Sequence, residues 1–207
     1  MRFLNGLFEY VIKTASKYRI DESHGLGHSM AVLHNANNIY KSEVVLNPSL
    51  QKQEKIIYAS AILHDMCDKK YRIDESHGLS EIKSYLINYL PSKDIGTCNN
   101  IIKNMSYSTV KINGFPTLDE YQSAYHIVRE ADLLAAYDFD RCMIYGMMKN
   151  NSTLYESFHD ATELFNNRVF KHMEDGLLTT KYSQQQHVTL SVIAHARIDS
   201  WKDILNK

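Results

Sequence analysis

Apolar residues at helical spacing run through almost the whole chain, and this pattern constrains the fold more than any other feature. In residues 3–15, for example, Phe3, Leu7 and Val11 fall on one side of a helix. Only three prolines and eight glycines interrupt the 207 residues, which suits packed helices with short connections. Alternation of β-branched residues is brief and isolated, so no strand is predicted. The sequence therefore predicts an all-α protein.

The predicted helices follow one another closely. We expect a helix over 27–40 to begin after a pair of glycines, and a helix over 50–66 to be buried because of its apolar run YASAIL. Residues 106–117 are predicted to form a loop. No shift in composition marks a domain boundary, so a single domain over 1–207 is expected. The other predicted helices cover 80–90, 94–105, 119–137, 140–149, 151–175 and 184–205.

Composition and charge exclude several classes of protein. The net charge of −1 gives no overall attraction to nucleic acid or to an anionic membrane, and no apolar run approaches the ~20 residues that span a bilayer. The N-terminus lacks the continuous apolar core of a signal peptide. The cysteines argue against a disulfide framework and a thiolate zinc site, because they are three and lack C-x-x-C spacing. We expect an intracellular, cytoplasmic protein, and the sequence does not indicate its oligomeric state.

The decapeptide KYRIDESHGL occurs twice, at 17–26 and 70–79. Folding repeats run to ~20–50 residues, so ten identical residues are too few to form one. The position four residues after the shared histidine is His28 in the first copy and Glu81 in the second, so only the first copy makes a His-x-x-x-His pair. We expect the second copy to be a surface loop. Its residues that could line a site near the first copy are Arg72 and His77.

Two histidines and two aspartates are predicted to share a metal ion. His64 and Asp65 end an apolar run that should be buried, and a charge at a buried helix face needs a partner. His28 follows the glycine-rich start of another helix, and Asp132 lies among apolar neighbours in a third. Such a set suits a divalent cation that accepts nitrogen and oxygen ligands, such as Mn, Fe, Co, Zn or Mg. If the ion is six-coordinate, two positions remain for water and a substrate oxygen, as a catalytic site requires.

At this point the chain resembles the HD-domain phosphohydrolase superfamily, over about residues 20–200. HGLGH (24–28) is similar to the His-x-x-x-His opening of one branch, and HDMCDKKY (64–71) to its HD-x-x-D-x-Lys-aromatic segment. READLLAAYD (129–138) is similar to the buried Asp-Ala-Asp helix of that branch. The resemblance implies a single-domain HD-type helical bundle. The chain departs from the branch at three positions that usually carry Asp, namely Gly25, Glu130 and Ala135.

The resemblance implies a metal-dependent phosphohydrolase that acts on a small nucleotide or related phosphoester. Conversion of a nucleoside triphosphate to monophosphate and pyrophosphate ranks first, and 5′-nucleotidase-type removal of one phosphate ranks second. A di-iron HD-fold oxygenase and a non-catalytic nucleotide-binding protein are the alternatives. Two-metal HD proteins carry further histidines between the HD pair and the last Asp, where this chain has only His77 and His126. A single metal ion is therefore favoured, with manganese among the choices, and the implied ligands are His28, His64, Asp65 and Asp132.

Roles follow for residues around the ligands. A bound divalent ion activates water and polarises phosphoryl oxygens. Asp68, three residues after Asp65, is the candidate to orient or deprotonate that water, with an exposed helix-end acid as the alternative. His24 is expected to donate to a phosphate or to hold His28. The candidate phosphate contacts are Lys69, Lys70 and Arg141. Of these three, Lys69 is also counted among the candidate catalytic residues. The candidate sugar or phosphate contacts, or else residues of a plain solvent loop, are Ser106, Tyr107, Ser108 and Lys111. The other histidines are predicted to be surface or core residues.

Overall fold

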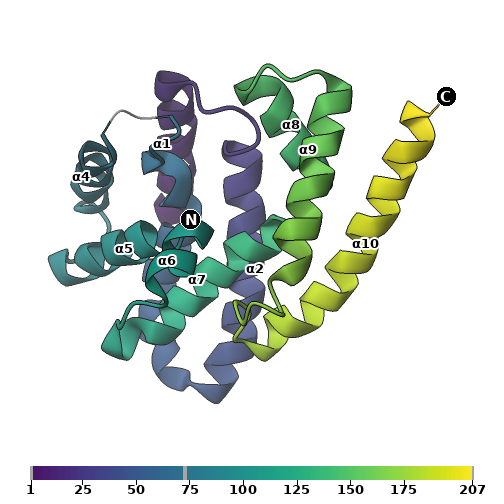
Figure 1. Cartoon of the computed structure of the whole chain (residues 1–207). Helices are drawn as coiled ribbons and strands as arrows, with labels where there is room; N and C mark the ends of the chain where they lie inside the picture. Colours follow the sequence, from purple (N-terminus) through teal and green to yellow (C-terminus); the bar gives the residue numbers. More distant parts are fainter. Residues whose placement is uncertain (1, 72–73, 207) are drawn as a thin grey trace.

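The computed structural model describes residues 2–71 and 74–206. Those residues form helices, turns and loops and no β-strand, which confirms the predicted all-α class (Figure 1). Across the same residues, no helix is both long enough and apolar enough to cross a membrane. The α-helices are α1 (Arg2–Tyr18), α2 (Leu26–Leu46), α3 (Glu54–Leu63), α4 (Glu75–Leu86), α5 (Ser92–Asn104), α6 (Tyr107–Asn113), α7 (Gln122–Ala135), α8 (Phe139–Lys149), α9 (Leu154–Asn167) and α10 (Lys181–Leu205). Short 3₁₀ segments are η1 (Pro48–Gln53), η2 (His64–Cys67), η3 (Asp119–Tyr121) and η4 (Val169–Lys171).

Helices α2, α3 and α7 pack against one another at the centre of the molecule. Seven of the ten residues of α3 are buried, including Ile57, Ile62 and Leu63. A helix that is apolar on nearly all sides belongs in a protein interior, which explains why the run YASAIL lies here. Helices α1, α4 and α5 lie to one side of this centre, and α8, α9 and α10 lie to the other (Figure 1). Side chains on α2, α3 and α7 are therefore held in place by helices that pack on both sides of them.

Helices α8 and α9 form a closely packed pair beside this centre. Phe139 and Phe165 join them in an apolar cluster that also includes Ala194 of α10. Gly146 permits the close approach, because a Cβ atom there would lie 2.8 Å from the Oγ atom of Ser157. The chain leaves α9 at Arg168, where the backbone turns out of the helix with φ −136° and ψ −60°. The pair therefore presents residues of both helices to the same side.

Three predicted elements differ from the structure. The single helix expected over 50–66 is wrong, because η1, α3 and η2 divide that segment, with α3 beginning only at Glu54. The loop predicted at 106–117 contains α6, whose first turn is capped by Ser106 through its Oγ, which accepts from the Thr109 N–H. The helix predicted over 151–175 ends as α9 at Asn167. In each case a local cap or a change of winding moves a boundary that apolar spacing does not mark.

The two copies of KYRIDESHGL begin with the same local hydrogen bonds and then diverge. Asp21 accepts from the N–H of Ser23 at 2.9 Å, and Asp74 accepts from the N–H of Ser76 at 2.8 Å. In the second copy this bond is the N-cap of α4, so the expected surface loop is wrong and the segment begins a helix. In the first copy the chain continues as a turn, and α2 begins only at Leu26. Identical residues thus adopt different structures because their surroundings differ.

Candidate metal centre

Three elements bring the four predicted ligands to one place. His28 lies in the first turn of α2, His64 and Asp65 begin η2 directly after α3, and Asp132 lies in α7. The exposed fractions of the side chains are 1% for His28 and 13% for Asp65. They are 4% for His64 and 24% for Asp132. The packing of α2, α3 and α7 therefore holds two imidazoles and two carboxylates out of bulk water.

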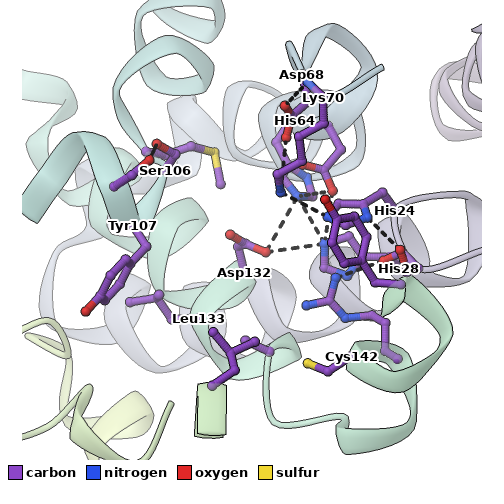
Figure 2. Close-up of a pocket in the computed structure, with 18 of the residues that line it drawn as sticks. His24, His28, His64, Asp68, Lys70, Ser106, Tyr107, Asp132, Leu133 and Cys142 are labelled. Atoms are coloured by element: carbon purple, nitrogen blue, oxygen red, sulfur yellow. Dashed lines mark hydrogen bonds and ion pairs between the residues drawn. The ribbon is translucent and has the colours of Figure 1, made fainter. Parts of the chain in front are cut away.

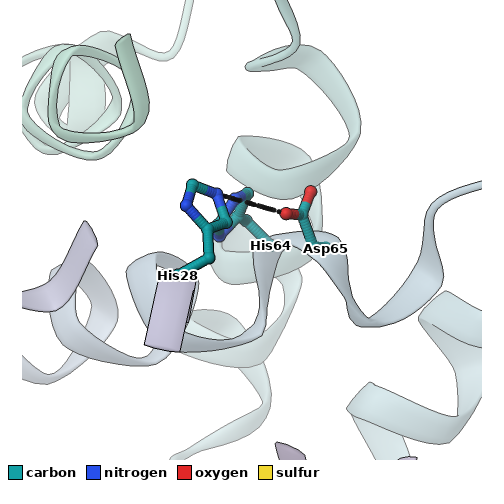
Figure 3. A group of neighbouring side chains, drawn as sticks. All are labelled: His28, His64 and Asp65. Carbon is teal, nitrogen blue, oxygen red and sulfur yellow. Dashed lines mark hydrogen bonds and ion pairs between the residues drawn. The ribbon is translucent and has the colours of Figure 1, made fainter. Parts of the chain in front are cut away.

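The ligand atoms face one another at short range. The Nε2 atoms of His28 and His64 lie 3.2 Å apart. The Oδ2 atom of Asp65 is 3.3 Å from Nε2 of His28 and 3.2 Å from Nε2 of His64 (Figure 3). The Oδ1 atom of Asp132 is 3.3 Å from Nε2 of His28 and 3.6 Å from Nε2 of His64. Figure 2 shows Asp132 directing its carboxylate at the two imidazoles.

These separations match the edges of a metal coordination sphere. An octahedral ion with ligands at about 2.1 Å places neighbouring donor atoms about 3.0 Å apart, and a tetrahedral ion places them about 3.4 Å apart. The ligand atoms of His28, His64 and Asp65 all lie within 4.8 Å of one another, so one ion can reach all three. Asp132 adds a fourth donor beside both imidazoles.

The hydrogen bonds around the ligands direct Nε2 of His64 and Oδ2 of Asp65 toward the space between the four side chains. Nδ1 of His64 lies 2.9 Å from the carbonyl oxygen of Ala61, which only accepts, so Nδ1 carries the proton. When a metal ion replaces the second proton of this imidazole, Nε2 is the lone pair that binds the ion. Oδ2 of Asp65 is buried without a hydrogen-bond donor in the described part of the chain. A bound cation would satisfy both Nε2 of His64 and Oδ2 of Asp65. The set of donor atoms suits a metal that takes nitrogen and oxygen ligands.

The pKa shifts at the centre also show that a positive charge between these side chains is favoured. Burial lowers the pKa of His64, but the charges of Asp65 and Asp132 outweigh it and hold that pKa well above 6.5. Burial raises the carboxyl pKa of Asp65 and Asp132, but the two imidazoles outweigh it and hold both values well below 3.8. The two carboxylates therefore stay ionised and attract a proton or a metal ion to the space between the imidazoles.

The ligands form part of the wall of a cavity of about 550 Å³, which lies within the range of small-molecule sites. Twelve of the predicted site residues line it, together with residues of α5, α8 and α9. Lys111 is not among the lining residues, because its Nζ atom pairs with Asp175 at 3.1 Å. The structure therefore places Lys111 apart from the other predicted site residues. The predicted site residues and ligands in the lining are His24, His28, His64, Asp65, Asp68, Lys69, Lys70, Ser106, Tyr107, Ser108, Asp132 and Arg141.

His24 is buried beside the predicted ligands, and both of its ring nitrogens are occupied by other residues. Its Nδ1 atom lies 2.7 Å from Oγ of Ser23 and 3.0 Å from the hydroxyl of Tyr71. Both hydroxyls donate to the carboxylate of Asp21, so their oxygens accept from Nδ1–H of His24. Burial lowers the pKa of His24 to about 4. The ring is therefore neutral at pH 7, with its Nε2 lone pair 3.4 Å from Nζ of Lys70.

Lys70 is held in place from two sides. Its Nζ atom lies 3.5 Å from the carboxylate of Asp68 and donates a hydrogen bond to the Nε2 lone pair of His24. The carboxylate of Asp68 also accepts from the backbone N–H of Lys70 at 2.8 Å. Asp68 itself lies just after η2 in an extended conformation, with φ −60° and ψ 129°. Lys69 is exposed at the cavity rim.

Arg168 is a cavity residue that sequence reasoning missed. It lies between α9 and η4, lines the cavity, and places its guanidinium carbon 4.0 Å from the centre of the Tyr107 ring. Burial lowers the pKa of Arg168, and Arg141 acts in the same direction, whereas the charge of Asp132 opposes it. No sequence signal marks this position, because it falls inside a stretch that apolar spacing predicts to be helical.

The two histidines between Asp65 and Asp132 have partners other than the predicted ligands. His77 is exposed, with Nε2 3.6 Å from Glu81. His126 interacts with Gln122 and Arg129. Neither lines the cavity, and Arg72, the other residue considered in the second decapeptide, lies outside the described residues.

Glu130, one of the departures from the HD pattern, has a structural position. Its carboxylate is fully buried and accepts from the backbone N–H groups of Thr179 and Thr180, at 2.8 Å and 3.1 Å. It also pairs with Arg129 at 3.1 Å. Glu130 thus ties α7 to the start of α10 and does not line the cavity, so this departure leaves the ligands in place.

Comparison of the chain with protein-family models, with curated proteins and with solved structures found no match. The interpretation of the site therefore rests on its own residues and geometry.

Proposed function

We propose that this protein is a metal-dependent phosphohydrolase of the HD type, acting on a small nucleotide or related phosphoester. The observation that carries the proposal is the convergence of His28, His64, Asp65 and Asp132, from three helical elements, at separations of 3.2–3.6 Å. The resemblance of segments 24–28, 64–71 and 129–138 to one HD branch supports the same reading.

The four side chains would hold one divalent cation. When bound there, the ion supplies a Lewis acid for a phosphoryl oxygen and lowers the pKa of a water molecule. The chain's own contribution is to fix the ligands. Ala61 accepts from Nδ1 of His64 and so sets its tautomer, and the packing of α2, α3 and α7 fixes the directions of all four side chains.

Further residues on the wall would orient the reactants. Asp68 presents an acceptor oxygen on the same segment as the ligand Asp65, where it can hold a water molecule and take up a proton. Lys70, oriented by Asp68 and His24, and Arg141, whose Nη1 donates to the carbonyl of Ser23 at 2.8 Å, supply positive charge for phosphate oxygens. These roles agree with cavity dimensions that fit a mononucleotide-sized ligand.

The test uses protein stripped of metal and reloaded separately with Mn²⁺, Co²⁺, Zn²⁺, Fe²⁺ and Mg²⁺. A panel of nucleoside mono-, di- and triphosphates is then assayed for release of pyrophosphate and of orthophosphate. Pyrophosphate release from triphosphates would support the first-ranked reaction, and orthophosphate release from monophosphates would support the 5′-nucleotidase-type reaction. Absence of hydrolysis with every ion would overturn the proposal.

Asp65→Ala is the matched variant. We expect it to bind less than a tenth of the metal of the wild type and to lose about 10³-fold or more in kcat/KM, with unchanged helical circular dichroism. Asp203→Asn removes an exposed carboxylate far along α10 and serves as the control, with metal content and activity equal to the wild type. Hydrolysis that survives in Asp65→Ala would show that the site is wrongly assigned.

A further inference from the structure

The wall of the cavity carries two guanidinium groups that form no ion pair within 4.0 Å in the described part of the chain. Arg168 has no hydrogen-bond or ion-pair partner for its side chain among the residues that the structure describes, and its Nε atom is buried. Arg141 donates from Nη1 to the carbonyl of Ser23, but its Nε atom is buried and unpartnered within those same residues. A partly buried cation without an anion is unfavourable, so these groups indicate a missing anionic partner.

The two arginines come from the α8–α9 pair and not from the helices that hold the metal ligands. Arg141 lies in the first turn of α8, and Arg168 follows the last residue of α9. Neither guanidinium forms an ion pair within 4.0 Å with Asp65 or Asp132 in the described part of the chain. The charge of Arg141 nevertheless acts on Arg168, so the two cations lie near enough to repel each other. An anion between them would relieve that repulsion.

Tyr107 holds Arg168 in position. The guanidinium carbon of Arg168 lies 4.0 Å from the centre of the ring, a cation–π contact that fixes the plane of the group. The hydroxyl of Tyr107 makes no hydrogen bond to a described residue, so Tyr107 supports Arg168 through its ring alone. Tyr107 stands at the first position of α6, which Ser106 caps. The planar fork of an arginine held in this way matches phosphate and carboxylate oxygens.

We propose that Arg141 and Arg168, with Tyr107 as the platform for Arg168, form a second anion subsite in the cavity. The substrate would then carry an anionic group in addition to the phosphoryl group that faces the metal ligands. This inference rests on the proposed function for the first group, but the binding of the second group can be measured without turnover. A phosphate or a carboxylate fits the subsite, and Arg168 is the residue that would determine the preference for doubly anionic substrates.

The experiment measures binding by calorimetry to metal-loaded protein in excess Mn²⁺, so that the probe does not remove the ion. Inorganic tripolyphosphate is the probe for a multiply anionic chain, citrate is the probe for carboxylates, and orthophosphate is the single-group reference. We expect Arg168→Gln to weaken the better of the first two probes about 10- to 100-fold and orthophosphate less than threefold. Lys171→Gln removes an exposed cation three residues away and is expected to match the wild type.

Further variants separate the platform from a direct contact. Tyr107→Leu should weaken tripolyphosphate binding about as much as loss of Arg168, and Tyr107→Phe should restore it, because the ring and not the hydroxyl supports the guanidinium. Arg168→Lys retains the charge, guards against misfolding of the Gln variant, and should give an intermediate loss.

Two results would overturn the proposal: equal binding of all probes by Arg168→Gln and the wild type, or an equal loss for orthophosphate and the larger anions. If the wild type hydrolyses no phosphoester but still binds tripolyphosphate through Arg168, the proposed function fails and the subsite is supported. If it hydrolyses phosphoesters while Arg168→Gln retains full affinity, the subsite fails and the proposed function is unaffected.

Discussion

His172 should make the protein less stable as the pH falls. The residue is fully buried, and neither ring nitrogen has a hydrogen-bond partner in the part of the chain that the structure describes. Its ring contacts the rings of Tyr107 and Tyr137, with centroids 6.0 Å and 5.8 Å away. Burial lowers the pKa of His172 to about 3, with Arg168 acting in the same direction and Asp132 opposing it.

The sign and the size follow from this value. An unfolded chain binds a proton at His172 below a pKa of 6.5, whereas the folded protein binds it only near 3. Between these values the unfolded state takes up more protons, so the free energy of unfolding falls as the pH falls. Each pH unit below 6.5 costs about 1.4 kcal/mol, so His172 should cost about 2 kcal/mol between pH 7 and pH 5.

The variant His172→Met removes the titration and has a similar volume. Urea unfolding at pH 7 and pH 5 gives the free energy of unfolding of each protein. We expect the variant to gain about 2 kcal/mol relative to the wild type between pH 7 and pH 5. His159→Gln, at an exposed position, should follow the wild type at both values. A difference between His172→Met and the wild type that is the same at pH 5 and pH 7 would refute the reasoning.

Two other substitutions test what holds the site in place. Glu130→Gln should lower the free energy of unfolding by about 3 kcal/mol at pH 7, because it removes the buried charge that binds Arg129 and the start of α10; a loss below 1 kcal/mol in urea unfolding would contradict this. Gly146→Ala should cost about 1–3 kcal/mol in the same assay, because the new Cβ would lie 2.8 Å from Oγ of Ser157 and force α8 from α9. Gly96→Ala, also in a helix but with nothing within 4 Å, should cost nothing, and equal losses at the two glycines would argue against the close contact.

The structure shows which parts of the site were predictable. Helical spacing indicated the all-α class, and the embedding of His64, Asp65 and Asp132 in apolar surroundings indicated ligands, since buried charge needs a partner. Arg168 was missed because it becomes part of the cavity only where α9 ends, and a change in backbone direction carries no residue signature. The ion pair that holds Lys111 away from the cavity lining could not be predicted, because its partner, Asp175, is 64 residues away in the chain.

The duplicated decapeptide also shows that local sequence does not determine the role of a residue. Its two copies contain the same ten residues, yet His24 is buried beside the predicted metal ligands and His77 is exposed. Tyr71 of the second copy reaches Asp21 of the first at 2.7 Å, so the second copy helps to hold the first in place. Contacts between distant segments, and not local sequence, decide the role of each copy.

The most direct test of the central claim is anomalous scattering from crystals of the protein grown with Mn²⁺. The geometry predicts one peak about 2.0–2.3 Å from the Nε2 atoms of His28 and His64 and from carboxylate oxygens of Asp65 and Asp132. No peak between these four side chains in Mn²⁺-saturated crystals, or a peak held by other residues, would contradict it.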